Sequence, residues 1–481
     1  MEKIWEIDMK RVASGFIALT TGLLVVAHLS GCRSTSQRIA TYSAPSGEAV
    51  ADDYTVTVNG RPVDVYAAQG QYFEGDYTFA SFDFSGKAEI VVQSKASLDG
   101  VQIQPVRYAG WLTRKDAQAI TLEADAPFQM SVERNGRVKP LLLFGNAAET
   151  DAPKPGDPNV VYFAPGVHRT GKITLTDNQT LYLAGGAVVK GCVCAKGTNI
   201  TIRGRGILGG EESPRFKGPG RYLLDCQDCR NLTVRDITLR NPWSWTFVTW
   251  NCDGVLIDNV KICGSRMIND DALDLVNTRN ATVRNCFFRT QDDCIAIKGL
   301  AKMPAPCENI LIEGCTLWTD RANIFRIGYE CETSGMRNIV ARDIDVPHYS
   351  MNYRAPTEYW ANAIIWLQPN QDMTMERCHF ENIRIRSDGD DILMLMAKPM
   401  RCRYGEYKHP EPGALRDCSF KDIQVTGSQK DFHGLLYMTG DSPQHAVSGL
   451  HFENMVYFGK PVTRDASCVQ IGPHADDITF R

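Results

Sequence analysis

The sequence has no surplus of positive charge. It holds 52 Lys and Arg residues against 56 Asp and Glu residues, which gives a formal net charge of −4 and a pI near 6.2. A nucleic-acid partner usually requires a clustered basic face. The composition therefore argues against a nucleic-acid-binding protein.

An uninterrupted apolar run of membrane-spanning length is also missing. The most apolar stretch runs from Phe16 to Leu29 and is interrupted by Thr20, Thr21 and His28. A transmembrane helix needs about 20 predominantly apolar residues, so a membrane span is disfavoured. Basic residues precede this stretch and the box Leu-Ser-Gly-Cys follows it, a pattern typical of the export signal of a bacterial lipoprotein.

The box predicts that Cys32 is the first mature residue and carries a lipid. Residues 1–31 are then a signal peptide, and the small, polar residues 32–50 are expected to form a flexible tether. We expect a lipoprotein of the bacterial outer membrane, periplasmic or surface-exposed. It would meet the membrane only through its N-terminal lipid.

Short alternating apolar runs fill the segment from Tyr54 to Phe144, among them YTVTVNG, AEIVVQS and KPLLLFG. Asn-Gly and Ser-Gly turns separate them, which is typical of antiparallel strands joined by hairpins. We expect a small antiparallel β-sandwich over residues 51–150. Three prolines in the stretch DAPKPGDPN, residues 151–159, indicate a domain boundary.

A convincing helical period is absent from the rest of the chain, where a short phrase recurs instead. Its copies begin 23 to 32 residues apart: NITIRGRGIL at Asn199, NLTVRDITLR at Asn231, GVLIDNVKIC at Gly254, NATVRNCFFR at Asn280, NILIEGCTLW at Asn309 and NIVARDIDVP at Asn338. Each phrase reads as two very short strands, and stacked repeats of this kind bury a shared core. The sequence predicts an all-β fold, a parallel β-helix over residues 156–481.

The 16 cysteines do not form a clear disulfide or metal pattern. Only Cys226-Gln-Asp-Cys229 has the spacing of half a zinc site, and no second pair stands at ligand spacing. Cys229, Cys252 and Cys307 each stand two residues before a repeat phrase, and others occupy aliphatic slots of the phrase. Such cysteines are expected to be buried small hydrophobes. We expect no metal, no cofactor and no need for disulfides.

An acidic phrase occurs twice within the repeat, as NDDALDL at residues 269–275 and, 22 positions later, as QDDCIAI at residues 291–297. Residues one coil apart become neighbours about 4.8 Å apart along the axis of a β-helix. Asp271 should therefore lie beside Asp293, with Asp292 offset from both.

Strand alternation predicts which side chains near this phrase leave the coil. Leu273 and Leu275, like Ile295 and Ile297, are expected to point inward. The intervening residues are expected to point outward, namely Ala272, Asp274, Cys294 and Ala296. Lys298 continues this outward series and is expected to face the cleft.

Three neighbouring carboxylates repel one another unless they share a proton, a water or a ligand. Glycoside hydrolysis needs such a set: a protonated carboxyl donates to the leaving oxygen, and one or two carboxylates deprotonate water. Asp residues that only cap turns are the alternative for a single pair. Two pairs in register favour catalysis.

The stretch NPWSWTFVTWNCDGVLIDNVKI, followed by NDDALDL and QDDCIAIKG, resembles the polygalacturonases of glycoside hydrolase family 28. It also resembles the family 49 dextranases and isopullulanases, whose β-helix follows a β-sandwich, and CTLWTDRANIFRIGYE looks closer to these. The resemblance spans residues 51–400 and implies a right-handed β-helix and an inverting hydrolase. It makes Asp292 the general acid, and Asp271 and Asp293 the pair that holds and activates water. Inverting enzymes separate acid and base by about 6.5 to 9.5 Å.

Two departures from family 28 bear on the substrate. Its Gly-His-Gly corresponds to Ala322-Asn323-Ile324, and the Arg-Ile-Lys that grips a uronate carboxylate falls near Ile365-Trp366-Leu367. Both departures favour a neutral or only partly acidic α-linked glycan. Polygalacturonate stays open as a substrate because Arg326 and Lys298 can bind an acid sugar.

The candidate substrate-binding residues lie in or just after the acidic coils. They include aromatic residues because sugar rings lie on flat apolar faces. The full set is Asn269, Asp274, Lys298, Trp318, Asn323, Arg326, Tyr329, Trp360 and Trp366. The expected partner is a polysaccharide or oligosaccharide.

Two other functions remain open from the sequence. β-Helices also host polysaccharide lyases, which need a basic residue to take a proton, and no His or Lys base adjoins the acidic cluster in sequence. A non-catalytic glycan-binding lipoprotein is the other alternative, and turnover of any glycan would exclude it.

Overall fold

The computed structural model describes residues 38–71, 75–300, 305–358, 361–401 and 411–481. The predicted signal peptide, the lipidation site Cys32 and the candidate sugar-binding residue Trp360 lie outside these residues. One compact unit spans Gln37–Arg481. Within the part of the chain that the structure describes, no helix has the length and apolar composition of a membrane span.

Two sheets precede the repeat and share one apolar core, as in a β-sandwich. The first sheet contains β1 (Arg38–Thr41), β4 (Tyr66–Ala68), β5 (Tyr77–Ser85), β7 (Gln102–Gln104), β10 (Phe128–Glu133) and β11 (Leu141–Ala147). The second contains β2 (Tyr54–Val58), β3 (Arg61–Val63), β6 (Ala88–Ser94), β8 (Leu112–Lys115) and β9 (Ala119–Ala124), and a 3₁₀ helix, η2 (Val106–Trp111), lies between β7 and β8. The pairs are antiparallel except β5 with β11, which is parallel.

The flexible tether expected over residues 32–50 is wrong for Arg38–Thr41. These residues form β1, which pairs with β5 so that Ile39 lies opposite Phe84. Ile39 packs against the core of the sandwich. An edge of β5 and an apolar contact therefore order a segment whose polar composition had suggested a tether.

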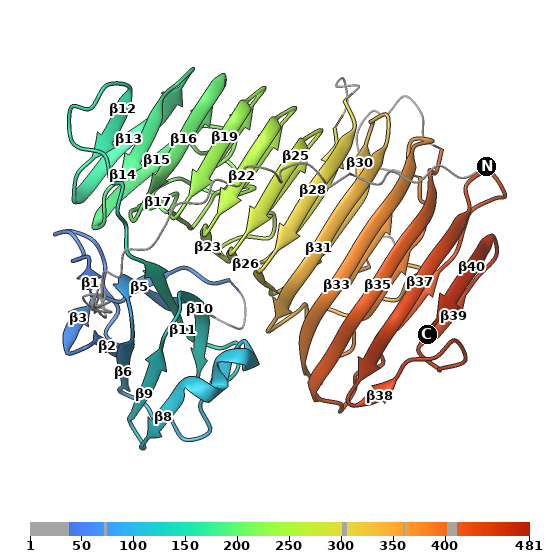
Figure 1. Cartoon of the computed structure of the whole chain (residues 1–481), viewed down its shortest axis with the longest axis horizontal. Helices are drawn as coiled ribbons and strands as arrows, with labels where there is room; N and C mark the ends of the chain where they lie inside the picture. The colour runs from blue at the N-terminus through green and yellow to red at the C-terminus, as the bar shows by residue number, and fades with distance from the viewer. Residues whose placement is uncertain (1–37, 72–74, 301–304, 359–360, 402–410) are drawn as a thin grey trace, which may run out of the picture. The chain divides into compact units, whose positions relative to one another are not determined.

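The remaining strands form the parallel β-helix predicted from the repeat, so that prediction is confirmed. Figure 1 shows strands of successive coils lying side by side from β12 to β40. The pairings sort the strands into three columns, here named columns A, B and C. Each coil contributes about one strand to a column, and long strands such as β15 and β31 pair in two columns.

The bounds of these strands follow their columns. Column A contains β12 (Val160–Phe163), β14 (Thr180–Leu183), β16 (Thr198–Gly204), β19 (Arg230–Arg235), β22 (Asp253–Asp258), β25 (Arg279–Arg284), β28 (Cys307–Glu313), β31 (Met336–Val346), β33 (Thr374–Asp388), β35 (Ala414–Ser428), β37 (Val447–Tyr457), to which β38 (Lys460–Pro461) adds an antiparallel pair, and β40 (Ala475–Phe480). Column B contains β13 (Gly166–Leu175), β15 (Ala187–Ala195), β17 (Ile207–Gly209), β20 (Thr238–Arg240), β23 (Lys261–Gly264), β26 (Phe287–Thr290) and β29 (Thr316–Thr319). Column C contains β18 (Leu224–Gln227), β21 (Phe247–Trp250), β24 (Leu273–Val276), β27 (Ile295–Gly299), β30 (Phe325–Cys331), β32 (Ala363–Gln368), β34 (Leu393–Ala397), β36 (Leu435–Met438) and β39 (Val469–Ile471).

The asparagine that opens most repeat phrases has a structural cause. Asn280, Asn309 and Asn338 have φ values of 53°, 56° and 56°, in the left-handed region that asparagine tolerates better than most residues. Their side chains stack as a ladder, since the Asn309 amide donates to Asn280 at 3.0 Å and the Asn338 amide donates to Asn309 at 2.9 Å. In the coil that has glycine in this place, Gly254 has a φ of 72°.

The interior of the coils is one continuous apolar core. All described cysteines are free and all but Cys194 and Cys468 are buried, which confirms that they serve as small hydrophobes. In the later coils, phenylalanine rings stack along the axis, with centroids 4.8 Å apart between Phe420 and Phe452 and 4.5 Å apart between Phe452 and Phe480. This packing fixes the register on which the candidate site depends.

Candidate active site

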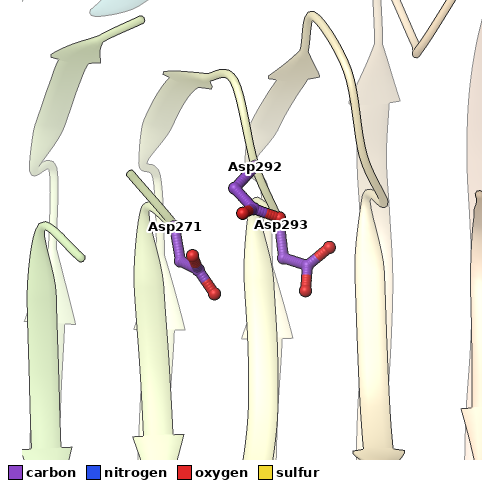
Figure 2. A group of neighbouring side chains, drawn as sticks. All are labelled: Asp271, Asp292 and Asp293. Carbon is purple, nitrogen blue, oxygen red and sulfur yellow. The ribbon is translucent and has the colours of Figure 1, made fainter. Parts of the chain in front are cut away.

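Column C brings the two acidic phrases into register. Leu273 of β24 pairs with Ile295 of β27, 22 residues later, as the repeat predicted. The backbone N–H of Ala272 donates to the carbonyl of Asp293 at 2.8 Å, so the residues before the two strands are also aligned. Figure 2 shows Asp271 on one coil and Asp292 and Asp293 on the next.

The three carboxylates form a compact group. One oxygen of each of Asp271, Asp292 and Asp293 lies within 4.8 Å of the others. These nearest oxygens are closer together than the about 6.5 to 9.5 Å expected between the acid and base carboxyl groups of an inverting enzyme. The cause is the scaffold: Asp271 and Asp293 lie on adjacent coils, and Asp292 directly precedes Asp293.

The first aspartates of the two phrases differ in role. Asp270 is fully buried and accepts hydrogen bonds from the backbone N–H groups of Arg266 at 2.9 Å and Gln291 at 2.8 Å. The hydroxyl of Thr290 also donates to it, at 2.8 Å. Burial raises the pKa of Asp270 to about 7. Asp270 therefore joins two successive turns, whereas Asp292, the first aspartate of the second phrase, is partly exposed.

The carboxylates of Asp271 and Asp293 each accept hydrogen bonds through one of their two oxygens. The ammonium of Lys298 donates to Oδ2 of Asp271 at 3.1 Å, and Oδ1 of Asp271 has no hydrogen-bond partner. Asn323 donates to Oδ1 of Asp293 twice, from Nδ2 at 2.6 Å and from its backbone N–H at 3.2 Å. The arrangement leaves the second oxygen of each carboxylate for a shared ligand such as a water molecule.

Asp292 and Asp271 differ in pKa because their surroundings differ. Withdrawal from water raises the pKa of Asp292 well above its ordinary value, and the charges of Asp271 and Asp293 raise it further. Burial also raises the pKa of Asp271, but the neighbouring Lys298 ammonium opposes this, and the result is about 6. At neutral pH the geometry therefore favours a protonated Asp292 beside an ionised Asp271.

Asn323 does not have the substrate-binding role predicted from the sequence. It is 2% exposed, and its side-chain oxygen accepts from the backbone N–H of Ala363 at 2.8 Å. Because both ends of its amide are used, Asn323 fixes the orientation of Asp293 and is not free to bind a sugar hydroxyl. Asn269, in contrast, is exposed beside the acidic group, as a substrate-binding residue needs to be.

Asp274 and Lys298 point away from the apolar core, as the alternation predicted, but both are covered. Asp274 is 0% exposed and Lys298 is 3% exposed. Their side chains form an ion pair of 2.8 Å. Both side chains therefore lie beneath the protein surface and can affect a substrate only through neighbouring groups.

Two of the predicted sugar-binding tryptophans are wrong in this structure. Trp318 is fully buried, packs with Phe144 and Phe287 in one apolar cluster, and donates to Asp320 at 2.7 Å. Trp366 is fully buried too, with the Arg326 guanidinium 3.8 Å from its ring centre. Both side chains leave the coil as alternation requires, but neighbouring segments cover them.

Tyr329 and Arg326 are largely buried beside Trp366. Tyr329 is 5% exposed, and the Arg326 guanidinium lies 4.6 Å from its ring centre. Arg326 is 5% exposed, its Nε has no hydrogen-bond partner, and no carboxylate pairs with it among the described residues. A guanidinium held between two rings without an anion is a potential binding group for one.

The sequence analysis missed three residues of this region. Trp245 is partly exposed, stacks on Tyr222 with centroids 5.3 Å apart, and lies with its ring centre 3.7 Å from the Lys298 ammonium. Glu330 pairs with the same ammonium at 3.2 Å. The strand register could have pointed to Trp245 and Glu330. The backbone N–H of Thr246, next to Trp245, donates to the carbonyl of Asp271 one coil later. Glu330 lies four residues after Arg326 on β30.

Comparisons with known proteins find relatives for the coils that carry the acidic phrases. The model of glycosyl hydrolases family 28 matches residues 192–320, which include all three clustered aspartates and end before Arg326 and Glu330. A probable polygalacturonase from Vitis vinifera is 25% identical over 161 residues, and a polygalacturonase from Juniperus ashei is 33% identical over 118 residues. The aligned part is 32% of this chain and 32% of the Vitis protein, and 21% and 23% for the Juniperus protein. The chain thus spans about a third or less of the length of these relatives.

Solved structures extend the likeness to nearly the whole chain. Dex49A from Penicillium minioluteum matches with a TM-score of 0.65 and 15% identity, covering 90% of this chain and 96% of that one. The family 28 exopolygalacturonase of Yersinia enterocolitica matches with a TM-score of 0.50 and 13% identity, covering 92% and 97%. At such identities the likeness concerns the fold alone. The chain is therefore a right-handed parallel β-helix protein whose central coils match the glycosyl hydrolases of family 28.

Proposed function

We propose that this protein is a glycoside hydrolase that cleaves α-linked glycans with inversion at the anomeric carbon. One observation carries the proposal: three carboxylates lie within 4.8 Å, two of them each held by one oxygen, and the third partly exposed with a raised pKa. The match of residues 192–320 to family 28 supports the same class of reaction.

In this mechanism Asp292 donates its proton to the glycosidic oxygen as the bond from that oxygen to the anomeric carbon breaks. A water held by the free oxygens of Asp271 and Asp293 attacks the same carbon and gives a proton to this pair. Two convergent carboxylates suit a bound water better than a single nucleophile, which supports inversion in spite of the short spacing. A second water or buffer proton later restores Asp292.

The stack of Tyr222 and Trp245 supports binding of a sugar ring next to the carboxylates. Trp245 is partly exposed and stacks on Tyr222 with an interplanar angle of 6°. Aromatic faces of this kind suit the apolar faces of sugar rings. The uncharged Ile365-Trp366-Leu367, where family 28 has its uronate-binding motif, favours a neutral glycan.

A second candidate is an acidic glycan, as in a polygalacturonase, and Arg326 favours it. Its guanidinium is one coil beyond Ala296 and has no carboxylate partner among the described residues. A uronate carboxylate would supply that partner. The two relatives from Vitis and Juniperus support this candidate, since both are polygalacturonases by name.

The lyase alternative loses support from Lys298. The sequence analysis found no base beside the acidic phrase, but the fold places Lys298 3.1 Å from Asp271. Burial alone would lower the pKa of this lysine, yet the three carboxylates around it, Asp271 foremost, raise it well above its ordinary value. A lysine that stays protonated cannot take a proton from a sugar, so Lys298 is no lyase base.

The test is a panel of α-glucans, α-galactosides and polygalacturonate, with the anomer of the first product followed by proton NMR. We expect reducing ends to appear on at least one α-linked glycan, with the opposite anomer to the substrate. A retained anomer would overturn the inverting mechanism, and unsaturated products absorbing in the ultraviolet would indicate a lyase. Release of galacturonate that is lost in Arg326→Met would select the acidic candidate over the neutral one.

The export signal read from the sequence completes the proposal: the enzyme acts outside the cytoplasm, held by a lipid on Cys32. Incorporation of labelled palmitate that disappears in Cys32→Ala tests this part. Incorporation that persists in the variant would place the lipid elsewhere.

A further inference from the structure

Lys298 is shared by three carboxylates. Its ammonium lies 3.1 Å from Asp271, 2.8 Å from Asp274 and 3.2 Å from Glu330. The face of Trp245 lies 3.7 Å from the same nitrogen. One positive charge therefore serves three groups that compete for it, at a place almost closed to water.

These groups come from three successive coils of column C. Asp274 lies on β24, Lys298 on β27 and Glu330 on β30, and Asp271 lies two residues before the start of β24. The register of β24 with β27 pairs Asp274 with Ala296, two residues before Lys298. Glu330 lies at the irregularity where the pairing of β27 with β30 shifts register. Among the residues that the structure describes, only Lys298 pairs with both Asp271 and Glu330.

Asp274 has the shortest contact with the ammonium but is closed to water. It is fully buried, and burial raises its pKa well above the ordinary value. Glu330 is partly exposed and so keeps contact with solvent.

We propose that Lys298 and Glu330 are positioning residues that set the protonation of Asp271. Lys298 stabilises the ionised form of the Asp271 carboxylate. Glu330 reduces this stabilisation because it pairs with the same ammonium. The inference rests on the proposed hydrolase function, in which Asp271 must be ionised to receive the proton of the water. Two other titratable groups lie next to Asp271: the charge of Asp293 favours the protonated form of Asp271 by repulsion, whereas Asp292 is itself protonated in the proposed mechanism.

The sign of each change follows from this arrangement. Removing the ammonium removes the group that stabilises ionised Asp271, so Asp271 should titrate at higher pH. Removing the charge of Glu330 takes away a repelling anion and leaves the ammonium to Asp271, so Asp271 should titrate at lower pH. A charge within about 4 to 6 Å shifts a pKa by about 1 unit or more.

The experiment compares pH profiles of kcat/KM, which report groups of the free enzyme. In Lys298→Met the acidic limb should move up by about 1 pH unit, and in Glu330→Gln it should move down. Lys298→Arg should return the limb toward that of the unmodified enzyme. Glu313→Gln is the matched control, because Glu313 also pairs with a cation, Arg342 at 2.7 Å, but on column A. The control should leave the limb in place.

A second measurement does not depend on activity. Carbon NMR of enzyme labelled at the aspartate carboxyl carbon, with the signal of Asp271 identified by its loss in Asp271→Asn, follows the titration directly. Shifts of opposite sign in the two variants would support the inference. Shifts of equal sign, or none, would overturn it. Absence of hydrolysis on every glycan would instead count against the proposed function, and the NMR titration would still decide the inference.

Discussion

Asp292→Asn should lower turnover of a natural α-glycoside by about 10²- to 10⁴-fold, the usual contribution of a general acid. Asparagine has the same shape but no proton to give to the leaving oxygen. On a glycosyl fluoride or dinitrophenyl glycoside, whose leaving group needs no proton, the loss should be much smaller. The measurement is kcat for both substrates with both proteins.

The ratio of the two losses is the informative quantity. A variant that merely misfolds would lose activity on both substrates together, so the thermal unfolding midpoints of the two proteins serve as the control. Near-normal turnover of the natural glycan by Asp292→Asn would mean that another group supplies the proton. The partly exposed position of Asp292 and its raised pKa make it the best placed donor among the described residues.

Asp271→Asn and Asp293→Asn should each impair both kinds of substrate to a similar degree, by about 10²- to 10⁴-fold. These residues act on the water, and every substrate needs the water whatever its leaving group. The loss should appear mainly in kcat, since neither residue is needed to hold the distant part of the glycan. Full activity of either variant on the fluoride would contradict the shared-water arrangement.

Steric damage needs a separate control for this pair. Asn323→Leu leaves the carboxylate of Asp293 in place but removes the amide that donates to it at 2.6 Å. We expect this variant to retain more activity than Asp293→Asn, because the reacting group is still present and only its orientation is lost. A deeper loss in Asn323→Leu would assign the effect to disturbed packing.

Much of the fold could be predicted because the repeat exposes it. The spacing of the phrases predicted the coils, and the 22-residue step between the acidic phrases predicted that Leu273 pairs with Ile295. Periodicity also identified Asp274 and Lys298 as outward residues, but it was wrong for Ala272 and Cys294, which lie in the apolar core of the coils. All these features depend on local alternation and on neighbouring coils, which a single sequence records directly.

Burial of the outward side chains could not be predicted in the same way. Alternation indicates that Trp318 and Trp366 leave the coil, but it does not indicate which distant segment covers them. Trp318 is covered by a cluster that includes residues of the sandwich, such as Phe144. The different roles of Asp270 and Asp292 were hidden for a similar reason, because identical letters precede turns with different hydrogen-bond donors.

The separation of strands from connections has an evolutionary consequence. The reacting carboxylates are positioned by the pairing of β24 with β27. The segment between β31 and β32 is a connection, and its Asn362 donates to the carbonyl of Arg321 at 2.9 Å. A β-helix coil tolerates insertions at its corners without a change of strand register. Substrate choice in such a scaffold can therefore drift through insertions and deletions in one corner segment while the chemistry is inherited unchanged.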